Sequence, residues 1–207
     1  MLGPEGAAEH ARAWLAERIP ARLRVLETRY SLPANALANP TRVLAHEVGP
    51  IGLEDWPTVY VRPQRLERLE LVDVRGDASE VYRVTYALRV LAWVRADGHQ
   101  ATDRLRKRYA LAIREALLER KSLTPAATYG SGDYGGDGDT AIDPGSIRED
   151  YSDVFTDEAK RTIAGVIIDV NLIVVEVLDG PAALGTVTTV DVQETGDTAA
   201  IPPHPAL

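Results

Sequence analysis

A two-residue alternation between residues 81 and 94 restricts the fold of this chain more than any other feature of its sequence. Apolar side chains recur at every second position, and the positions between them are mixed. This is the period of a β-strand, and a strand with one apolar and one mixed face is typical of an antiparallel sheet buried on one side. The apolar face would carry Tyr82, Val84, Tyr86, Leu88, Val90, Ala92 and Val94, and the other face Val81, Arg83, Thr85, Ala87, Arg89, Leu91 and Trp93.

Two segments before the alternating strand are predicted to be strands as well. Residues 66–74 would pair with it, because the sequence RGDAS at 75–79 supplies a turn between the two. Upstream, Pro57 and Pro63 bound a compact strand, PTVYVRP, which fits a sheet edge or a strand end.

The second half of the chain predicts two further strands. Residues 163–178 alternate again, with Ala164, Val166, Ile168, Val170, Leu172 and Val174 on one side. Their other side also carries apolar residues, so we expect this strand to be buried on both faces for part of its length; these residues are Ile167, Ile173, Val175 and Val177. A last strand, rich in Thr and Val, is predicted at 185–194.

Two helical regions are indicated by apolar residues at three- and four-residue spacing. Pro4 suits a first helical turn, and a stripe follows over Ala8, Ala11, Leu15 and Ile19. Pro20 predicts a kink or an end at Ile19, and then a second short helix with Leu23, Leu26 and Tyr30 on its inner face. A long helix is predicted from a capping Thr102, with the apolar face Leu105, Tyr109, Ala112, Ile113, Ala116 and Leu117.

These elements predict an α+β fold, a mainly antiparallel sheet with the N-terminal helix and the long helix packed on one face. Residues 31–56 are expected to form an extended loop with at most short strands, because they carry prolines and glycines and little periodicity. We expect one domain over residues 1–194, interrupted by a Gly/Asp-rich loop at 124–146, and a Pro-rich tail at 195–207.

Composition excludes several classes of function. The chain has 207 residues with a formal net charge of −8, which argues against a general nucleic-acid binder, since such proteins need a basic face. It has no cysteine, which excludes disulfides, thiolate metal sites and a cysteine nucleophile. No segment has the apolar length of a membrane span, and the first residues lack a signal-peptide pattern, so we expect a cytosol-like compartment and no membrane partner.

The glycine-rich loop contains two motif-like patterns. Gly130, Gly132 and Gly135 match the dinucleotide fingerprint, but no strand leads into them and the neighbouring aspartates would repel phosphate. The carboxylates of this loop could instead be calcium ligands, although the EF-hand spacing is absent; they are Asp133, Asp137, Asp139 and Asp143. A solvated acidic loop is the interpretation we favour, and a calcium-binding module stays an alternative.

The sequence offers no catalytic arrangement. The four histidines are scattered, at His10, His46, His99 and His204, and no pair has the spacing of zinc ligands. No nucleophile elbow or phosphate-loop lysine is present. We therefore expect no catalytic residues, no cofactor and no resident metal, and a protein that is not an enzyme.

Two groups of residues are candidates for protein interfaces. The second face of strand 81–94 carries Arg83, Arg89 and Trp93, and Arg and Trp are enriched in interfaces. The alternative is that another helix covers this face. Arg104 and Arg108 belong to a basic cluster of the long helix, which could contact acidic loops or nucleic acid, or simply be solvated.

The order of elements resembles the tail terminator and tail-completion proteins of long-tailed bacteriophages. The resemblance rests on a helix that runs into Ile19-Pro20, a Pro-x-Val-x-Val strand at 57–61, and the long alternating strand at 82–94. It continues through the helix around Ala112–Leu117, an insertion, and the apolar strand at 166–177. The match covers most of residues 5–194, without the loop 124–146 or the tail.

This resemblance implies a structural virion protein that forms a ring, commonly a hexamer. Such a ring caps the tail tube, ends its polymerisation and joins the tail to the head connector, after assembly in the host bacterial cytoplasm. The implied partners are further copies of the chain, the tail-tube protein and a head-closure or connector protein, with DNA only passing through the lumen. An acidic loop would suit such a lumen or a contact between rings, through Asp133, Tyr134, Asp137 and Asp139. Another neck component, such as a head-closure or connector ring protein, is the alternative within the same class.

Overall fold

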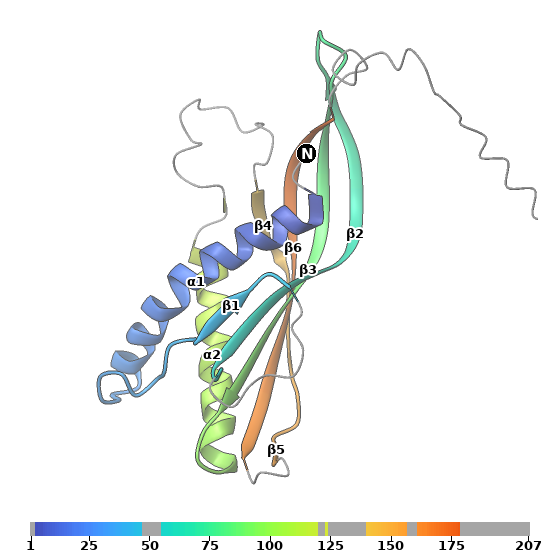
Figure 1. Ribbon diagram of the computed structural model, residues 1–207. Coiled ribbons are helices and arrows are strands. Elements are labelled where there is room, and N and C mark those ends of the chain that lie inside the picture. The colour runs from blue at the N-terminus through green and yellow to red at the C-terminus, as the bar shows by residue number, and fades with distance from the viewer. Residues whose placement is uncertain (1–2, 47–54, 120–122, 124–139, 157–160, 179–207) are drawn as a thin grey trace, which may run out of the picture.

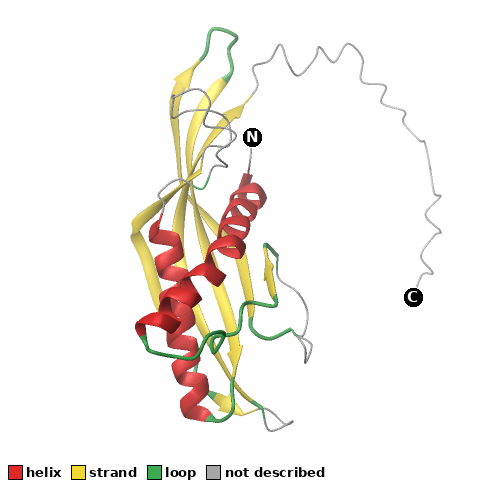
Figure 2. Cartoon of the chain, turned by 90° about the vertical axis from the view of Figure 1, so that its left-hand side faces the viewer, coloured by secondary structure: helices red, strands yellow, loops and turns green. Residues whose placement is uncertain are grey.

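The protein is an α+β structure in which two helices lie on one face of a six-stranded sheet (Figures 1 and 2). The computed structural model describes residues 3–46, 55–119, 123, 140–156 and 161–178. The strand order is β1-β2-β3-β6-β4, β5 also pairs with β6, and every pairing except that of β1 with β2 is antiparallel. The predicted fold class and the one-sided helix layer are confirmed.

The centre of the sheet is the antiparallel pair of β3 (Glu80–Arg95) and β6 (Thr162–Leu178). Both strands were expected from the alternation, and the predicted inner residues from Val84 to Val94 are buried. The expectation that β6 is buried on both faces for part of its length holds at the start of the strand, but not at the residues on which it was based. At its start, residues 162–166 are buried on both sides, Ile163 being 7% exposed. The four second-side residues named above are only half-buried, because the helices cover just one face; they are Ile167, Ile173, Val175 and Val177.

β2 (Thr58–Val74) is one continuous strand where two were expected. The strand runs through Pro63, and its pairing with β3 is irregular between Pro63 and Arg65. Pro63 has no N–H to donate to the neighbouring strand, and the bulge beside it accommodates this. The predicted turn at 75–79 is confirmed, with the Arg75 N–H donating to the Ser79 carbonyl at 2.8 Å.

Short strands flank this core. β1 (Arg42–Leu44) pairs in parallel with the start of β2, in agreement with the mostly extended segment 31–56. β4 (Thr140–Tyr151) pairs with β6, and β5 (Phe155–Thr156) pairs with its beginning. The expected loop 124–146 therefore ends earlier, since 140–146 belong to a strand. Residues 124–139, the predicted strand 185–194 and the tail 195–207 lie outside the described residues.

α1 (Gly3–Arg29) is a single helix that continues through Pro20, so the predicted end at Ile19 and separate second helix were wrong. Ile19 and Leu23 are both fully buried, and we attribute the continuity to this burial, which offsets the hydrogen bond that proline cannot make. Tyr30 lies beyond the helix and is 47% exposed, so it is not on the inner face.

α2 (His99–Glu119) begins three residues before the expected cap. Thr102 lies inside the helix and is buried; its hydroxyl donates to the Ala96 carbonyl at 3.0 Å and accepts the Ala96 N–H at 3.2 Å. It therefore ties the helix to the end of β3. The predicted apolar face of α2 is confirmed, and the helix is joined to α1 by the Trp14 indole, which donates to the Ala116 carbonyl at 2.8 Å.

The sheet is longer than the helix layer. β2, β3 and the end of β6 extend past the helices and form a projecting arm (Figure 1). α1 reaches the base of this arm, where the Gly3 N–H and the Tyr86 hydroxyl both donate to the buried carboxylate of Glu176, at 2.7 and 3.0 Å. A carboxylate at a helix N-terminus is favourable because the first amides lack helical partners.

A second buried carboxylate holds the chain that follows α1. Glu27 is 4% exposed, accepts the amides of Leu37 and Asn35 at 2.7 and 3.2 Å, and pairs with Arg24. We expect Glu27→Ala to lower the free energy of unfolding by about 2–3 kcal/mol, because it leaves buried donors without an acceptor.

Thermal and urea unfolding would measure this loss. The matched control is Glu17→Ala on the same helix, whose side chain is 67% exposed and should change stability by under ~0.5 kcal/mol. Equal losses in the two variants would contradict the anchoring role of Glu27.

Candidate assembly interface

The sheet face opposite the helices is the candidate functional surface, and we call it the open face. It is formed by the alternate residues of β3 and β6 that point away from the helix layer, and no described helix lies on that side of the sheet (Figure 1). Apolar side chains form two groups on it. One holds Leu91, Trp93, Ile167 and Phe155, and the other holds Val81, Ile173, Val175 and Val177.

A polar band separates these two groups. Arg89 on β3 lies opposite Asp169 on β6, and its guanidinium donates to both carboxylate oxygens at 2.7 and 2.9 Å. This two-bond geometry fixes both side chains, although the pair is partly exposed and screened. The bond to Asp169 raises the pKa of Arg89 above its ordinary value, so the arginine is charged throughout the physiological range.

A hollow of about 310 Å³ lies beside this band. It forms where both neighbouring strands are irregular, β2 between Pro63 and Arg65 and β4 between Asp143 and Arg148. Bulges displace the side chains of a strand, and here they bring three arginines and two carboxylates to one place. The charged lining residues are Arg65, Arg89, Arg148, Glu67 and Asp169.

Trp93 lies flat against the sheet because its neighbour is a glycine. It pairs with Gly165 across β3 and β6, and a Cβ at position 165 would lie 2.9 Å from the indole. Phe155 of β5 packs edge-on against the ring, with centroids 6.4 Å apart. The indole is therefore positioned but still partly accessible, as an interface anchor would be.

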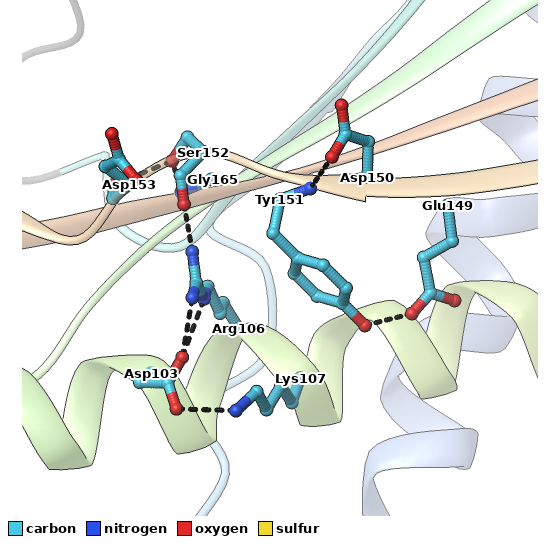
Figure 3. A network of polar contacts seen from close by, with 9 residues as sticks. All are labelled: Asp103, Arg106, Lys107, Glu149, Asp150, Tyr151, Ser152, Asp153 and Gly165. Atoms are coloured by element: carbon cyan, nitrogen blue, oxygen red, sulfur yellow. Dashed lines mark hydrogen bonds and ion pairs between the residues drawn. The ribbon is translucent and has the colours of Figure 1, made fainter.

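The basic cluster of α2 is largely occupied by contacts within the chain (Figure 3). Arg106 donates to Asp103 and to the Ser152 carbonyl and stacks over Tyr151 at 5.2 Å, and Lys107 also binds Asp103 at 2.8 Å. Hydrogen bonds from Lys107 and Arg106 lower the pKa of Asp103. These contacts join α2 to the end of β4, so the cluster has a structural role.

The structure separates the predicted interface residues into two groups. Arg83, Arg89 and Trp93 lie on the open face, as their strand alternation implied. Arg104 and Arg108 lie on α2, in the helix layer on the other side of the sheet; Arg104 is exposed, and Arg108 stacks over Tyr30 at 5.3 Å. The two groups do not form one surface.

The predicted lumen residues, Asp133, Tyr134, Asp137 and Asp139, lie outside the described residues.

Sequence reasoning missed three residues of the open face. Asp169 interrupts an apolar strand, and that interruption was the available signal for a partner on β3. Phe155 and Arg148 gave no signal, because they lie in segments without periodicity whose position depends on pairing with β6.

Other types of site gain no support from the described residues. Within them, no three His, Asp or Glu side chains are grouped as metal ligands, and no helix is long and apolar enough to cross a membrane. His10 is partly buried against the Thr140 hydroxyl at 2.9 Å, and burial lowers its pKa.

Comparison with protein families finds no family model that matches this chain, and comparison with curated proteins finds no match either.

The contact between Trp93 and Gly165 gives a prediction. Gly165→Ala should push the indole off the sheet, which exposes it to quenching by acrylamide and lowers the free energy of unfolding by about 1–3 kcal/mol. The measurement is best made in a background with Trp56 replaced by Phe; Trp14 is kept, because it is buried and joins the two helices.

Gly76→Ala is the control, because a Cβ there meets nothing within 4 Å. Unchanged quenching in Gly165→Ala would show that Trp93 does not depend on this glycine.

Proposed function

We propose that the protein is a ring-forming structural protein of a bacteriophage tail, of the tail terminator type. Its ring would cap the tail tube, end tube polymerisation and join the tail to the head connector, with DNA passing through the lumen. The protein would act without catalysis, in the virion, after assembly in the host bacterial cytoplasm. Its partners would be copies of itself in a hexamer, the tail-tube protein and a head-closure or connector protein.

The observation that carries this proposal is the one-sided coverage of the sheet. On the open face, Phe155 is 44% exposed and the other apolar residues are half-buried, except Val81, which is 6% exposed. Together with Arg89, Asp169 and Trp93 they form an accessible apolar and polar surface of the kind found in interfaces. The helix layer is different in chemistry. Its outer side carries ion pairs such as Arg22–Glu119 and Arg29–Glu115.

Two unlike surfaces on opposite sides of one subunit suit a ring. A closed ring of identical subunits uses a heterologous contact, in which one surface of each subunit meets a different surface of the next. A two-fold dimer would instead use one self-complementary patch. The order of helices and strands, which resembles tail terminators, supports the same proposal independently.

Substitution on the open face tests assembly. Leu91→Asp should abolish closed annuli in negative-stain electron microscopy and leave a folded monomer, because it places a charge in the apolar group of the open face. Leu91→Thr replaces the leucine by a smaller, more polar residue that is also favoured in β-strands. It should therefore weaken assembly while the protein still folds.

Gly76→Asp adds the same charge at the tip of the arm and should leave the annuli intact. Annuli in Leu91→Asp would contradict a role of the open face in the ring.

The terminator role has its own test. Purified protein added to polymerising tail-tube protein from the same virus should bind tube ends and stop elongation. A head-closure protein would bind the connector and leave tube length unchanged. Continued elongation with no bound protein would therefore contradict the terminator assignment even if rings form.

A further inference from the structure

The arm carries a row of exposed apolar side chains. Leu66, Leu69, Leu71 and Val74 of β2 are each more than half exposed. Their partners on β3 are Tyr86, Val84, Tyr82 and Glu80, which places the row on the helix side of the sheet. We call these four residues the leucine row.

The leucine row is exposed because α1 stops beside it. Gly3 is bound to Glu176 of β6, so the first turns of α1 cover β6 and β3, where Val174 and Val84 are buried. A hollow of about 1000 Å³ remains between the start of α1, the end of β1 and residues 62–64 of β2. Its lining on β2 ends at Gln64, two residues before Leu66.

The edge of β2 is also open along the arm. Among the described strands, β1 pairs only with residues 58–60 of β2. Residues 62–74 therefore present backbone donors and acceptors as well as an apolar row, which is the arrangement that accepts an added strand.

The described chain ends at the tip of the arm, level with the end of this edge. Val74 pairs with Glu80, and Glu80 pairs with Leu178, so the three residues form one row across the tip of the arm. A strand on the outer edge of β2 would lie three strand spacings from β6, about 14 Å, and residues 179–184 can span about 20 Å when extended. The segment that follows can thus reach the edge of β2.

That segment has the composition of a strand. Residues 185–194 read GTVTTVDVQE, and alternation places Thr186, Thr188, Val190 and Val192 on one side. Extended, these ten residues span about 33 Å, and the nine residues 66–74 of β2 span about 30 Å.

We propose that residues 185–194 of the same chain lie antiparallel to β2 along its open edge, with Val190 and Val192 against the leucine row. Attachment by a short linker gives this segment an effective concentration in the millimolar range, well above that of a second molecule. The side chains of Val190 and Val192 would then lie beside the leucine row on the same side of the sheet and reduce its exposure in each subunit. This inference does not depend on the proposed function.

Cysteine pairs test the position of the segment, since the chain has no cysteine of its own. If residue 185 lies near Val74, residue 190 lies near Leu69. Leu69→Cys with Val190→Cys should form a disulfide within one molecule under mild oxidation, seen as a faster monomer band without reductant.

The matched control is Arg68→Cys with Val190→Cys, because Arg68 is opposite Thr85 and points to the open face. It should not form the internal bond. If the first pair forms no disulfide at all, the proposal is overturned and the leucine row is uncovered. If it forms disulfides only between molecules, the proposal is overturned in favour of a second copy of the chain at the row.

A surface probe gives a second test that needs no disulfide. Val190→Asp with Val192→Asp should uncover the leucine row and raise the fluorescence of the apolar dye ANS severalfold. Thr189→Asp with Gln193→Asp adds the same charge on the other side of the segment and should not. Equal dye binding by the two double variants would overturn the proposal.

Discussion

The long antiparallel pairing of β3 with β6 is the interaction on which the rest of the structure depends. It runs in continuous register from Glu80↔Leu178 to Arg95↔Ile163 and fixes which side chains face the helices. A shift of β6 by one residue against β3 would turn its side chains to the opposite face, bringing Asp169 to the helix side and Val170 to the open face. The register of this pair therefore determines both which side chains form the core and which form the open face.

The mismatch in length between sheet and helices has equally direct consequences. α1 and α2 bury the body of the sheet, and the carboxylate of Glu176 fixes where α1 begins. Strands that continue past that point must form an arm, and the side of the arm that α1 does not reach exposes the leucine row. The structure thus leaves two apolar surfaces, the open face on one side of the sheet and the leucine row on the other.

Periodicity predicted the parts of the fold that are determined locally. The strands β3 and β6, the turn at 75–79 and the apolar face of α2 follow from the spacing of side chains. Prolines were misleading at Pro20 and Pro63, because burial of Ile19 and Leu23 and a bulge in β2 accommodate them. β4 was missed, since a strand with Asp143, Pro144 and Gly145 is defined by its pairing with β6 and has no pattern of its own.

The candidate site was predictable only in part, for a similar reason. Alternation placed Arg83, Arg89 and Trp93 on one face, whereas the contacts of Trp93 with Gly165 and Phe155 join residues that are distant in sequence. In the basic run of α2, Asp103, Tyr151 and the Ser152 carbonyl bind Arg106 within the chain, whereas Arg104 is exposed and stays a candidate contact residue. A run of charged residues in a sequence predicts an interaction surface only where those residues are not already bound to partners within the chain.

The central claim is that two unlike surfaces of one subunit meet in a closed ring. Sedimentation velocity of the full chain over a wide concentration range tests it most directly. A closed ring predicts monomer in equilibrium with one larger species of fixed stoichiometry, with few intermediates, because the last contact closes the assembly. Monomer at all concentrations, a two-fold dimer as the final species, or an open series of growing oligomers would contradict the account.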